Sequence, residues 1–297
     1  MRRVERAPAK LNLGLRIVGR RADGYHLLES VFVPFDLADE VALEIAPGVP
    51  RQVSLRVEGG GPELSDPARN LAARAARRFA ESAALDARVH VELRKSIPVG
   101  AGLGGGSSDA GAVLRGLDAL LPGALASERL TALALSLGAD VPFFLAPRPA
   151  RVTGIGEHVE PLAEVPPLAV LVVVPSPALA TAEVFRAFDA CGAPGAALTP
   201  GGRGRRMPPL PGARDDTRGW ARFLTNDLEP VATRLRPAIG RVRGELERSG
   251  ASAVGMSGSG PSVFGLFADA AGAHAAAEGG RWEPSDRMHV GRTAGSP

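Results

Sequence analysis

The segment that most restricts how this chain can fold is a glycine-rich stretch, SIPVGAGLGGGSS, at residues 96–108. It follows a stretch of alternating apolar residues typical of a strand and leads into an alanine- and leucine-rich stretch typical of a helix. Five of the seven residues from Gly100 to Gly106 are glycine. Glycine permits positive φ and carries no Cβ, so successive backbone N–H groups can converge on an anion at the positive end of a helix. The pattern predicts a strand, a phosphate-binding loop and a helix in this order.

Other nucleotide-binding motifs fit the chain less well. Gly100, Gly102 and Gly105 form a GxGxxG pattern, but the acidic residue that a dinucleotide site needs about 20 residues later is missing. No glycine in the chain precedes a lysine, which excludes a Walker A loop, and the HRD motif of protein kinases is absent. A Rossmann site therefore stays a weak alternative to a different kind of phosphate loop.

Hydrophobic periodicity predicts an alternating α/β chain. In the first half, strands are expected over residues 11–17, 41–45, 53–57 and 89–93, and helices over residues 70–84, 107–121 and 127–137. In the second half we expect a strand over 168–174, helices over 181–190 and 227–248, a hairpin over 256–267, a helix over 270–278 and a strand over 288–292. Asn226 is the expected N-cap of the helix over 227–248, with Glu229 at the reciprocal capping position.

Length and composition favour two domains. A chain of 297 residues can bury two ordinary cores, and we predict domains over residues 1–150 and 151–297. Residues 192–219 are rich in Gly, Pro and Arg without periodicity and predict a flexible surface insertion. We find neither an apolar run long enough to span a membrane nor a secretory signal, and we expect a cytoplasmic protein. The single cysteine, Cys191, excludes an internal disulfide, and the net charge of +3 suits an anionic small substrate.

Residue types that this chain avoids gather near its start. It contains 33 arginines but only two lysines, Lys10 and Lys95, and only three asparagines and one tyrosine. Lys10, Asn12 and Tyr25 nevertheless lie within sixteen residues of one another. A lysine is a compact, rotatable point charge that can approach a reacting oxygen without the planar fork of arginine. This clustering indicates chemistry rather than packing.

Three motifs in order resemble those of the GHMP kinase family, which includes galactokinases, homoserine kinases and mevalonate kinases. They are PAKLNL at residues 8–13, PVGAGLGGGSSDAGA at 98–112 and GMSGSGPS at 255–262. RADGYH at 21–26, LGADVPFF at 137–144 and NDLE at 226–229 resemble the members that act on a cytidine-diphosphate-linked polyol. The resemblance implies a two-domain α/β fold, with an N-terminal ribosomal-protein-like domain that binds nucleotide and a C-terminal ferredoxin-like domain.

The resemblance also implies roles for individual residues. Asp140 would be the general base for the substrate hydroxyl, and Lys10 its charged partner. Asn12 and Thr181 would contact the substrate, Tyr25 and Phe185 would stack on its cytosine, and His26 would read the edge of that base. Residues expected to bind ATP are Lys95, Pro98, Val99, Gly100, Ala101, Gly102, Leu103, Gly104, Gly105, Gly106, Ser107 and Ser108.

The cofactors implied are ATP and the Mg²⁺ that arrives with it, and no residue of the chain is predicted as a metal ligand. We expect a monomer or weak homodimer without nucleic-acid or membrane partners. Two alternatives stay open at this point. One is another GHMP small-molecule kinase, of homoserine or mevalonate type, which RADGYH argues against. The other is an RNA-binding protein of related fold, which the dispersed basic residues and an aromatic content of 4% disfavour.

Overall fold

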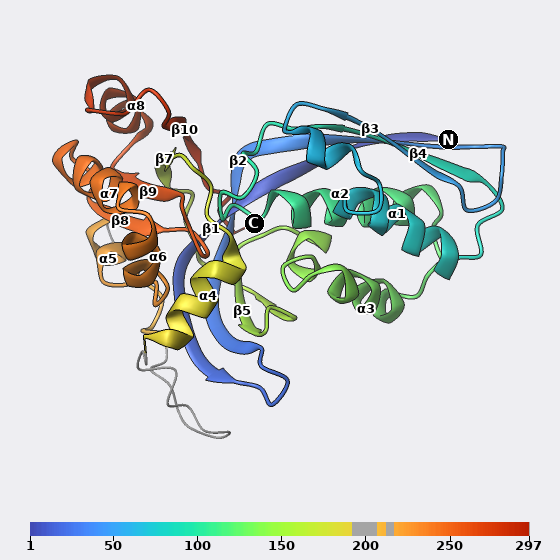
Figure 1. Cartoon of the computed structure of the whole chain (residues 1–297), viewed down its shortest axis with the longest axis horizontal. Helices are drawn as coiled ribbons and strands as arrows, with labels where there is room; N and C mark the ends of the chain where they lie inside the picture. Colours follow the sequence, from blue (N-terminus) through green and yellow to red (C-terminus); the bar gives the residue numbers. More distant parts are fainter. Residues whose placement is uncertain (192–206, 212–216, 297) are drawn as a thin grey trace. The chain divides into compact units, whose positions relative to one another are not determined.

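Two long strands, β1 (Arg2–Arg20) and β2 (His26–Ala46), pair with each other and contribute residues to both compact units of the chain. The computed structural model in Figure 1 describes residues 1–191, 207–211 and 217–296. The first unit comprises Met1–Ala9, Leu37–Val99 and Gly104–Pro147, and the second comprises Lys10–Asp36, Gly100–Leu103 and Arg148–Pro297. The boundary expected near residue 150 stays a prediction.

In the first unit, the sheet region formed by β1 and the C-terminal half of β2 is extended by two further strands. The strand β4 (Arg88–Arg94) runs antiparallel to β2, from Glu40 opposite Arg94 to Ala46 opposite Arg88, and β3 (Val53–Glu58) runs parallel to β4. Apolar residues alternate along β4, where Val89, Val91 and Leu93 are buried. The strands predicted over 41–45, 53–57 and 89–93 are confirmed, because their period-two patterns place one face on a core.

Helices of the first unit pack on one face of this region (Figure 1). They are η1 (Pro62–Ser65), α1 (Leu71–Ser82), α2 (Gly105–Leu120), α3 (Ser127–Leu137) and η2 (Pro142–Leu145). The three α-helices match the predicted ranges to within two residues at each end. Asn70 begins α1 as its N-cap, since its Oδ1 accepts from the backbone N–H groups of Ala72 and Ala73.

The second unit contains an antiparallel four-stranded sheet in the order β10-β7-β9-β8. Its strands are β7 (Ala169–Val174), β8 (Ala253–Met256), β9 (Val263–Phe267) and β10 (Arg287–Arg292). The helices are α4 (Thr181–Ala190), α5 (Thr217–Ala221), α6 (Glu229–Leu235), α7 (Ala238–Arg248) and α8 (Ala270–Gly279). The N-terminal half of β2 pairs antiparallel with β5 (Ala150–Gly154), which pairs in turn with β6 (His158–Pro161).

The helix predicted over residues 227–248 is wrong as a single element. It is divided into α6 and α7 at Arg236 and Pro237, because proline lacks an N–H and disfavours helical geometry in the residue before it. The N-cap of α6 is Leu228 rather than the predicted Asn226. Asn226 Oδ1 still accepts from the backbone N–H of Leu228 at 2.9 Å. Its Nδ2 donates to the carbonyls of Met256 and Gly258 at 2.9 and 2.8 Å, which fixes the turn after β8.

Most of the insertion predicted over residues 192–219 lies outside the described residues. Residues 207–211 form no regular element, and α5 begins at Thr217, so the end of the predicted insertion is helical. Within the ranges that the structure describes, no helix is both long enough and apolar enough to cross a membrane.

Candidate functional site

Lys10 and Asn12 lie two residues apart on β1 and therefore point to the same side of the strand. Each is only 3% exposed, and Lys10 Nζ donates to Asn12 Oδ1. Asn12 Nδ2 donates to the hydroxyl of Ser30 on β2 at 2.9 Å, and Lys10 Nζ lies 4.7 Å from the centroid of the Phe32 ring. Two of the three clustered rare residues, Lys10 and Asn12, thus belong to a buried polar network, whereas Tyr25 is exposed. Ser30, which completes the network, has no motif and was not predicted.

The turn between β8 and β9 joins this network to the glycine-rich loop within the second unit. Ser257 Oγ donates to the carbonyl of Gly102 at 3.0 Å and lies 3.3 Å from Asn12 Oδ1. The backbone N–H of Lys10 donates to the carbonyl of Leu103 at 2.9 Å. The first and third motifs of the sequence therefore contact the same part of the predicted phosphate loop.

Gly102 shows why this loop needs glycine. Its φ is +75°, in the region that L-residues rarely adopt. A Cβ built there would lie 2.5 Å from the carbonyl oxygen of Ser257 and 2.7 Å from that of Gly260. Both obstacles are backbone atoms, so neither can rotate away from an added methyl group.

The loop ends at the N-terminus of α2, where the N-cap residue, Gly104, provides no side-chain hydrogen bond. The N–H groups of a first helical turn have no partner within the helix and carry its positive dipole end, which suits a phosphate group. Ser107 is partly exposed in this turn, whereas Ser108 is fully buried and donates to the carbonyl of Pro8 at 2.7 Å. Of the remaining predicted loop residues, Val99, Gly100 and Gly106 are exposed, Ala101 and Leu103 are buried, and Pro98 and Gly105 are intermediate.

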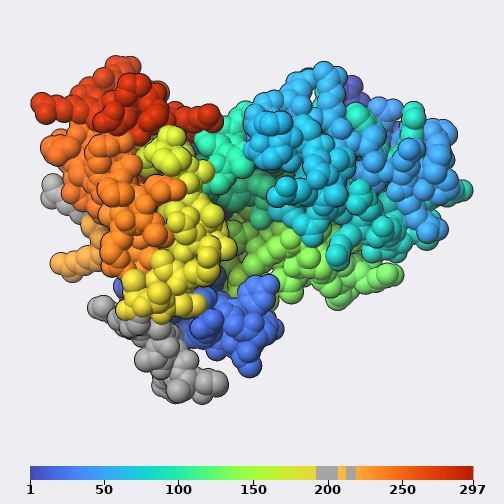
Figure 2. Space-filling view, in the orientation of Figure 1, coloured from blue at the N-terminus to red at the C-terminus, as the bar shows by residue number. Residues whose placement is uncertain are grey.

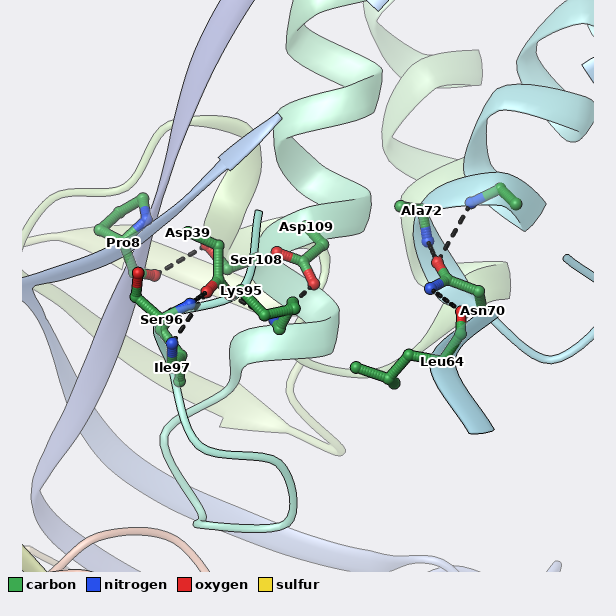
Figure 3. A network of polar contacts seen from close by, with 11 residues as sticks. Pro8, Asp39, Leu64, Asn70, Ala72, Lys95, Ser96, Ile97, Ser108 and Asp109 are labelled. Carbon is green, nitrogen blue, oxygen red and sulfur yellow. Dashed lines mark hydrogen bonds and ion pairs between the residues drawn. The ribbon is translucent and has the colours of Figure 1, made fainter. Parts of the chain in front are cut away.

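A buried group of three charges holds the segment before the loop (Figure 3). Figure 3 shows the Lys95 side chain between the carboxylates of Asp39 on β2 and Asp109 on α2. Lys95 Nζ donates to both carboxylates, at 2.7 Å in the case of Asp109. Asp39 Oδ1 also accepts from the backbone N–H groups of Ser96 and Ile97. Asp39 has no signature in the sequence, because an aspartate at an alternating strand position is usually solvated.

This group carries two potential negative charges against one positive charge. Burial raises the pKa of Asp109 to about 7, with the neighbouring Asp39 carboxylate acting in the same direction and Lys95 opposing it. Burial lowers the pKa of Lys95, but the two carboxylates outweigh it, so this pKa is raised. Asp109 Oδ1 is buried without a hydrogen-bond partner, which agrees with an acid that holds a proton.

Asp140 belongs to the first unit and lies in the turn between α3 and η2. The backbone N–H of Val141 donates to the carbonyl of Gly138 at 3.1 Å, and η2 follows from Pro142. Asp140 is half-buried. Its predicted partnership with Lys10, a residue of the second unit, stays a prediction.

The residues predicted for the cytosine end lie at the β1–β2 turn and on α4. The His26 imidazole stacks on the Phe185 ring, with centroids 4.9 Å apart and an interplanar angle of 25°. Tyr25 is 61% exposed. Thr181, at the start of α4, is 2.9 Å from the hydroxyl of Ser259 through its Oγ1. The structure thus brings His26 and Phe185 together and connects Thr181 to the third motif.

Comparison with known proteins identifies the class. The family model described as GHMP kinases N terminal domain matches residues 70–147, and that described as GHMP kinases C terminal matches residues 213–281. The chain belongs to the GHMP kinase family, and its two-domain α/β fold is the one predicted.

Curated relatives show which members of the GHMP kinase family this chain is similar to. A protein from Anaeromyxobacter dehalogenans (strain 2CP-1) is 44% identical over 279 residues, covering 93% of this chain and 84% of the relative. One from Sinorhizobium medicae is 40% identical, covering 97% and 94%. Both are named 4-diphosphocytidyl-2-C-methyl-D-erythritol kinase. A crystal structure of 4-(cytidine 5'-diphospho)-2C-methyl-D-erythritol kinase is 38% identical, with a TM-score of 0.74, and covers 99% of this chain and 100% of that one.

Proposed function

We propose that this chain transfers the γ-phosphoryl group of ATP to the 2-hydroxyl of 4-diphosphocytidyl-2-C-methyl-D-erythritol, a step of non-mevalonate isoprenoid precursor biosynthesis. Relatives named for this substrate are 40–45% identical to it over most of its length. The structural observation that carries the proposal is the buried network in which Lys10, Asn12 and Ser257 meet Gly102 of the glycine-rich loop.

In this reaction the substrate oxygen forms a bond to the γ-phosphorus while the bond from that phosphorus to the β–γ bridging oxygen breaks. ADP leaves, and the hydroxyl proton passes to a base. Such transfers depend mainly on positioning and on charge stabilisation, so a carboxylate that accepts the proton late is sufficient. We assign the proton acceptor to Asp140. We assign to Lys10 the stabilisation of charge on the transferring group, which a mobile ammonium suits.

ATP would bind through residues 98–108. The support is the first turn of α2, where the N-cap residue, Gly104, brings no side chain that would compete with a phosphate for the free N–H groups. Lys95 would contribute by holding Asp39 against the amides of Ser96 and Ile97, at the start of the loop.

Mg²⁺ bound to ATP would neutralise charge on the β- and γ-phosphates. Within the described ranges, His, Cys, Asp and Glu form no group of three or more that could hold a metal ion. At many nucleotide sites Mg²⁺ keeps most of its ligands from the phosphates and water.

The cytidine end of the substrate would be held by Tyr25, His26 and Phe185. Exposed or half-buried aromatic rings provide faces on which a pyrimidine stacks, worth about 1–3 kcal/mol per base, and an imidazole can discriminate donor from acceptor on the base edge. Asn12 and Thr181 would contact the polyol and its diphosphate. We also propose that the protein acts in the cytoplasm as a monomer or weak homodimer, and sedimentation velocity at assay concentration tests the oligomeric state.

The direct test is ADP release with ATP and magnesium in the presence of 4-diphosphocytidyl-2-C-methyl-D-erythritol, mevalonate or homoserine. Turnover with the cytidylated substrate alone, lost on Asp140→Ala, is the expected result. Turnover with mevalonate or homoserine instead would assign the chain to another activity of the family. Absence of turnover with all three alcohols would contradict the proposal.

A further inference from the structure

The His26 imidazole is fixed by three side chains from one face of α4. Phe185 stacks on the ring, Phe188 meets it edge-on at 6.0 Å and 83°, and Asp189 Oδ1 lies 2.8 Å from Nε2. These three residues are spaced i, i+3 and i+4, so they lie side by side on the helix. In Figure 2 the yellow residues of α4 adjoin the blue residues of the β1–β2 turn. His26 is the first residue of β2, directly after this turn.

Asp189 is the polar member of this group and was not predicted from the sequence. Its second oxygen, Oδ2, lies 3.4 Å from the guanidinium of Arg20, so the carboxylate faces a positive charge on its other side. An ionised carboxylate only accepts hydrogen bonds. His26 Nε2 must therefore carry the proton that it donates to Asp189.

The second ring nitrogen of His26 then has a defined role. In a neutral imidazole one nitrogen donates and the other accepts, so protonated Nε2 makes Nδ1 an acceptor. Among the described residues, no atom forms a hydrogen bond with His26 Nδ1. This nitrogen is also absent from the set of fully buried polar atoms that lack a hydrogen bond. It therefore reaches solvent as a hydrogen-bond acceptor of fixed orientation.

We propose that Asp189 is a positioning residue that fixes the tautomer of His26, so that Nδ1 accepts a hydrogen bond from the exocyclic amine of cytosine and disfavours uracil. This inference rests on the proposed function. Cytosine presents an N–H₂ donor where uracil presents a carbonyl oxygen, and an acceptor aimed at that point distinguishes the two bases. Two acceptors facing each other leave the imidazole nitrogen without a partner, which penalises the uridine substrate.

The substitution Asp189→Asn tests the tautomer. The amide can present its N–H₂ to Nε2, which moves the ring proton to Nδ1 and reverses its preference from donor to acceptor partners. The ratio of kcat/KM for the cytidine substrate to that for its uridine analogue should fall about tenfold or more, the discrimination that one hydrogen bond provides. Glu183→Gln is the matched control, because Glu183 is an acidic residue of α4 with no side-chain bond among the described residues. Its ratio should match the wild type.

A second readout does not depend on substrate. Long-range ¹H–¹⁵N correlation spectra of the free protein at about pH 8, with the His26 signals assigned by His26→Gln, report which nitrogen is protonated. We expect protonated Nε2 in the wild type and a changed pattern in Asp189→Asn. A wild-type His26 protonated at Nδ1, or an Asp189→Asn ratio within about twofold of the wild type, would overturn the proposal. If the wild-type protein does not phosphorylate the cytidine substrate, the proposed function is refuted, and with it the role of His26 in distinguishing cytosine from uracil. The spectra would still decide whether Asp189 fixes the tautomer of the His26 ring.

Discussion

Lys95 donates a hydrogen bond to Asp109 at 2.7 Å in a setting where only 4% and 5% of the two side chains are exposed. The same ammonium group also contacts Asp39, so one positive charge serves two buried carboxylates. One carboxylate of such a group binds a proton more readily than it would in water. The segment that leads into the glycine-rich loop is therefore anchored by a group whose charge depends on pH.

The stability of the protein should depend on pH through Asp109. Its pKa is raised to about 7 from 3.8, so between these values the folded state holds a proton that the unfolded state has released. The free energy of unfolding then decreases as pH rises from about 4 to about 7. In Asp109→Asn the side chain at this position is uncharged at every pH, so this contribution to the pH dependence of the free energy of unfolding should disappear. Denaturant unfolding at a series of pH values measures it.

The matched control for that series is Asp86→Asn, since Asp86 is exposed and has no ion pair among the described residues. Its unfolding curve should follow the wild type at each pH. A wild-type and an Asp109→Asn protein with the same pH dependence between 4 and 7 would show that Asp109 does not hold the proton.

Removal of the lysine should be far more damaging than removal of a surface charge. Lys95→Met leaves Asp39 and Asp109 facing each other without a cation, a change that costs about 3–5 kcal/mol in buried ion pairs. Above about pH 7, where the Asp109 carboxyl is otherwise charged, Asp109→Asn added to Lys95→Met should recover part of this loss, because one of the two facing charges is gone. Arg56→Met, at a pair with 65% of the arginine exposed, should cost less than about 1 kcal/mol. Additive effects of the two buried substitutions would argue against the coupling.

Gly102→Ala should disrupt the loop both because alanine disfavours a positive φ and because its Cβ would clash with neighbouring backbone. Substitution of Gly123 separates these two effects. Gly123 has a similar φ of +81°, but a Cβ there meets nothing within 4 Å. Gly123→Ala should therefore show only the cost of the left-handed backbone, roughly 1–2 kcal/mol. Gly102→Ala adds the clash with the Ser257 and Gly260 carbonyls and should lower both the melting temperature and kcat/KM further. Equal losses in the two variants would refute the steric argument.

Asp140→Asn and Lys10→Met should separate chemistry from binding. Loss of a general base lowers kcat by about 10²–10⁴-fold, and the KM for ATP should change little in Asp140→Asn. Lys10 is buried against Asn12, so Lys10→Met should also reduce stability. Thermal unfolding beside steady-state kinetics provides the comparison. An Asp140→Asn enzyme with wild-type kcat would remove Asp140 from the mechanism.

Most helices and strands could be predicted from the sequence, because each buries one face and the spacing of its apolar residues follows that face. The helices over 127–137 and 181–190 match α3 and α4 residue for residue. The single helix over 227–248 failed because the apolar period continues through Pro237, although the backbone cannot. Asn226 is not the N-cap residue of α6, although its Oδ1 accepts from the backbone N–H of Leu228 at 2.9 Å. Its amide N–H₂ donates to the carbonyls of Met256 and Gly258, about 30 positions away in the sequence, which the local pattern could not indicate.

Residues of the candidate site could be predicted from the sequence where a motif contains them, but not where only the packing of distant segments brings them together. The motifs located Lys10, Asn12 and the glycine-rich loop. Ser30, Asp39 and Asp189 could not be found in this way, because each acts through a partner distant in sequence, at separations of 18, 56 and 163 residues. Only the pairing of strands and helices brings such residues together.

The central claim is tested most directly by the ³¹P NMR spectrum of the product formed from ATP and 4-diphosphocytidyl-2-C-methyl-D-erythritol. Carbon 2 of this polyol bears a methyl group and no hydrogen, so a phosphate on its hydroxyl has no proton three bonds away. The account predicts one new phosphomonoester signal without three-bond proton coupling, formed in step with ADP. A phosphomonoester signal split by neighbouring CH or CH₂ protons, or no new phosphomonoester at all, would contradict it.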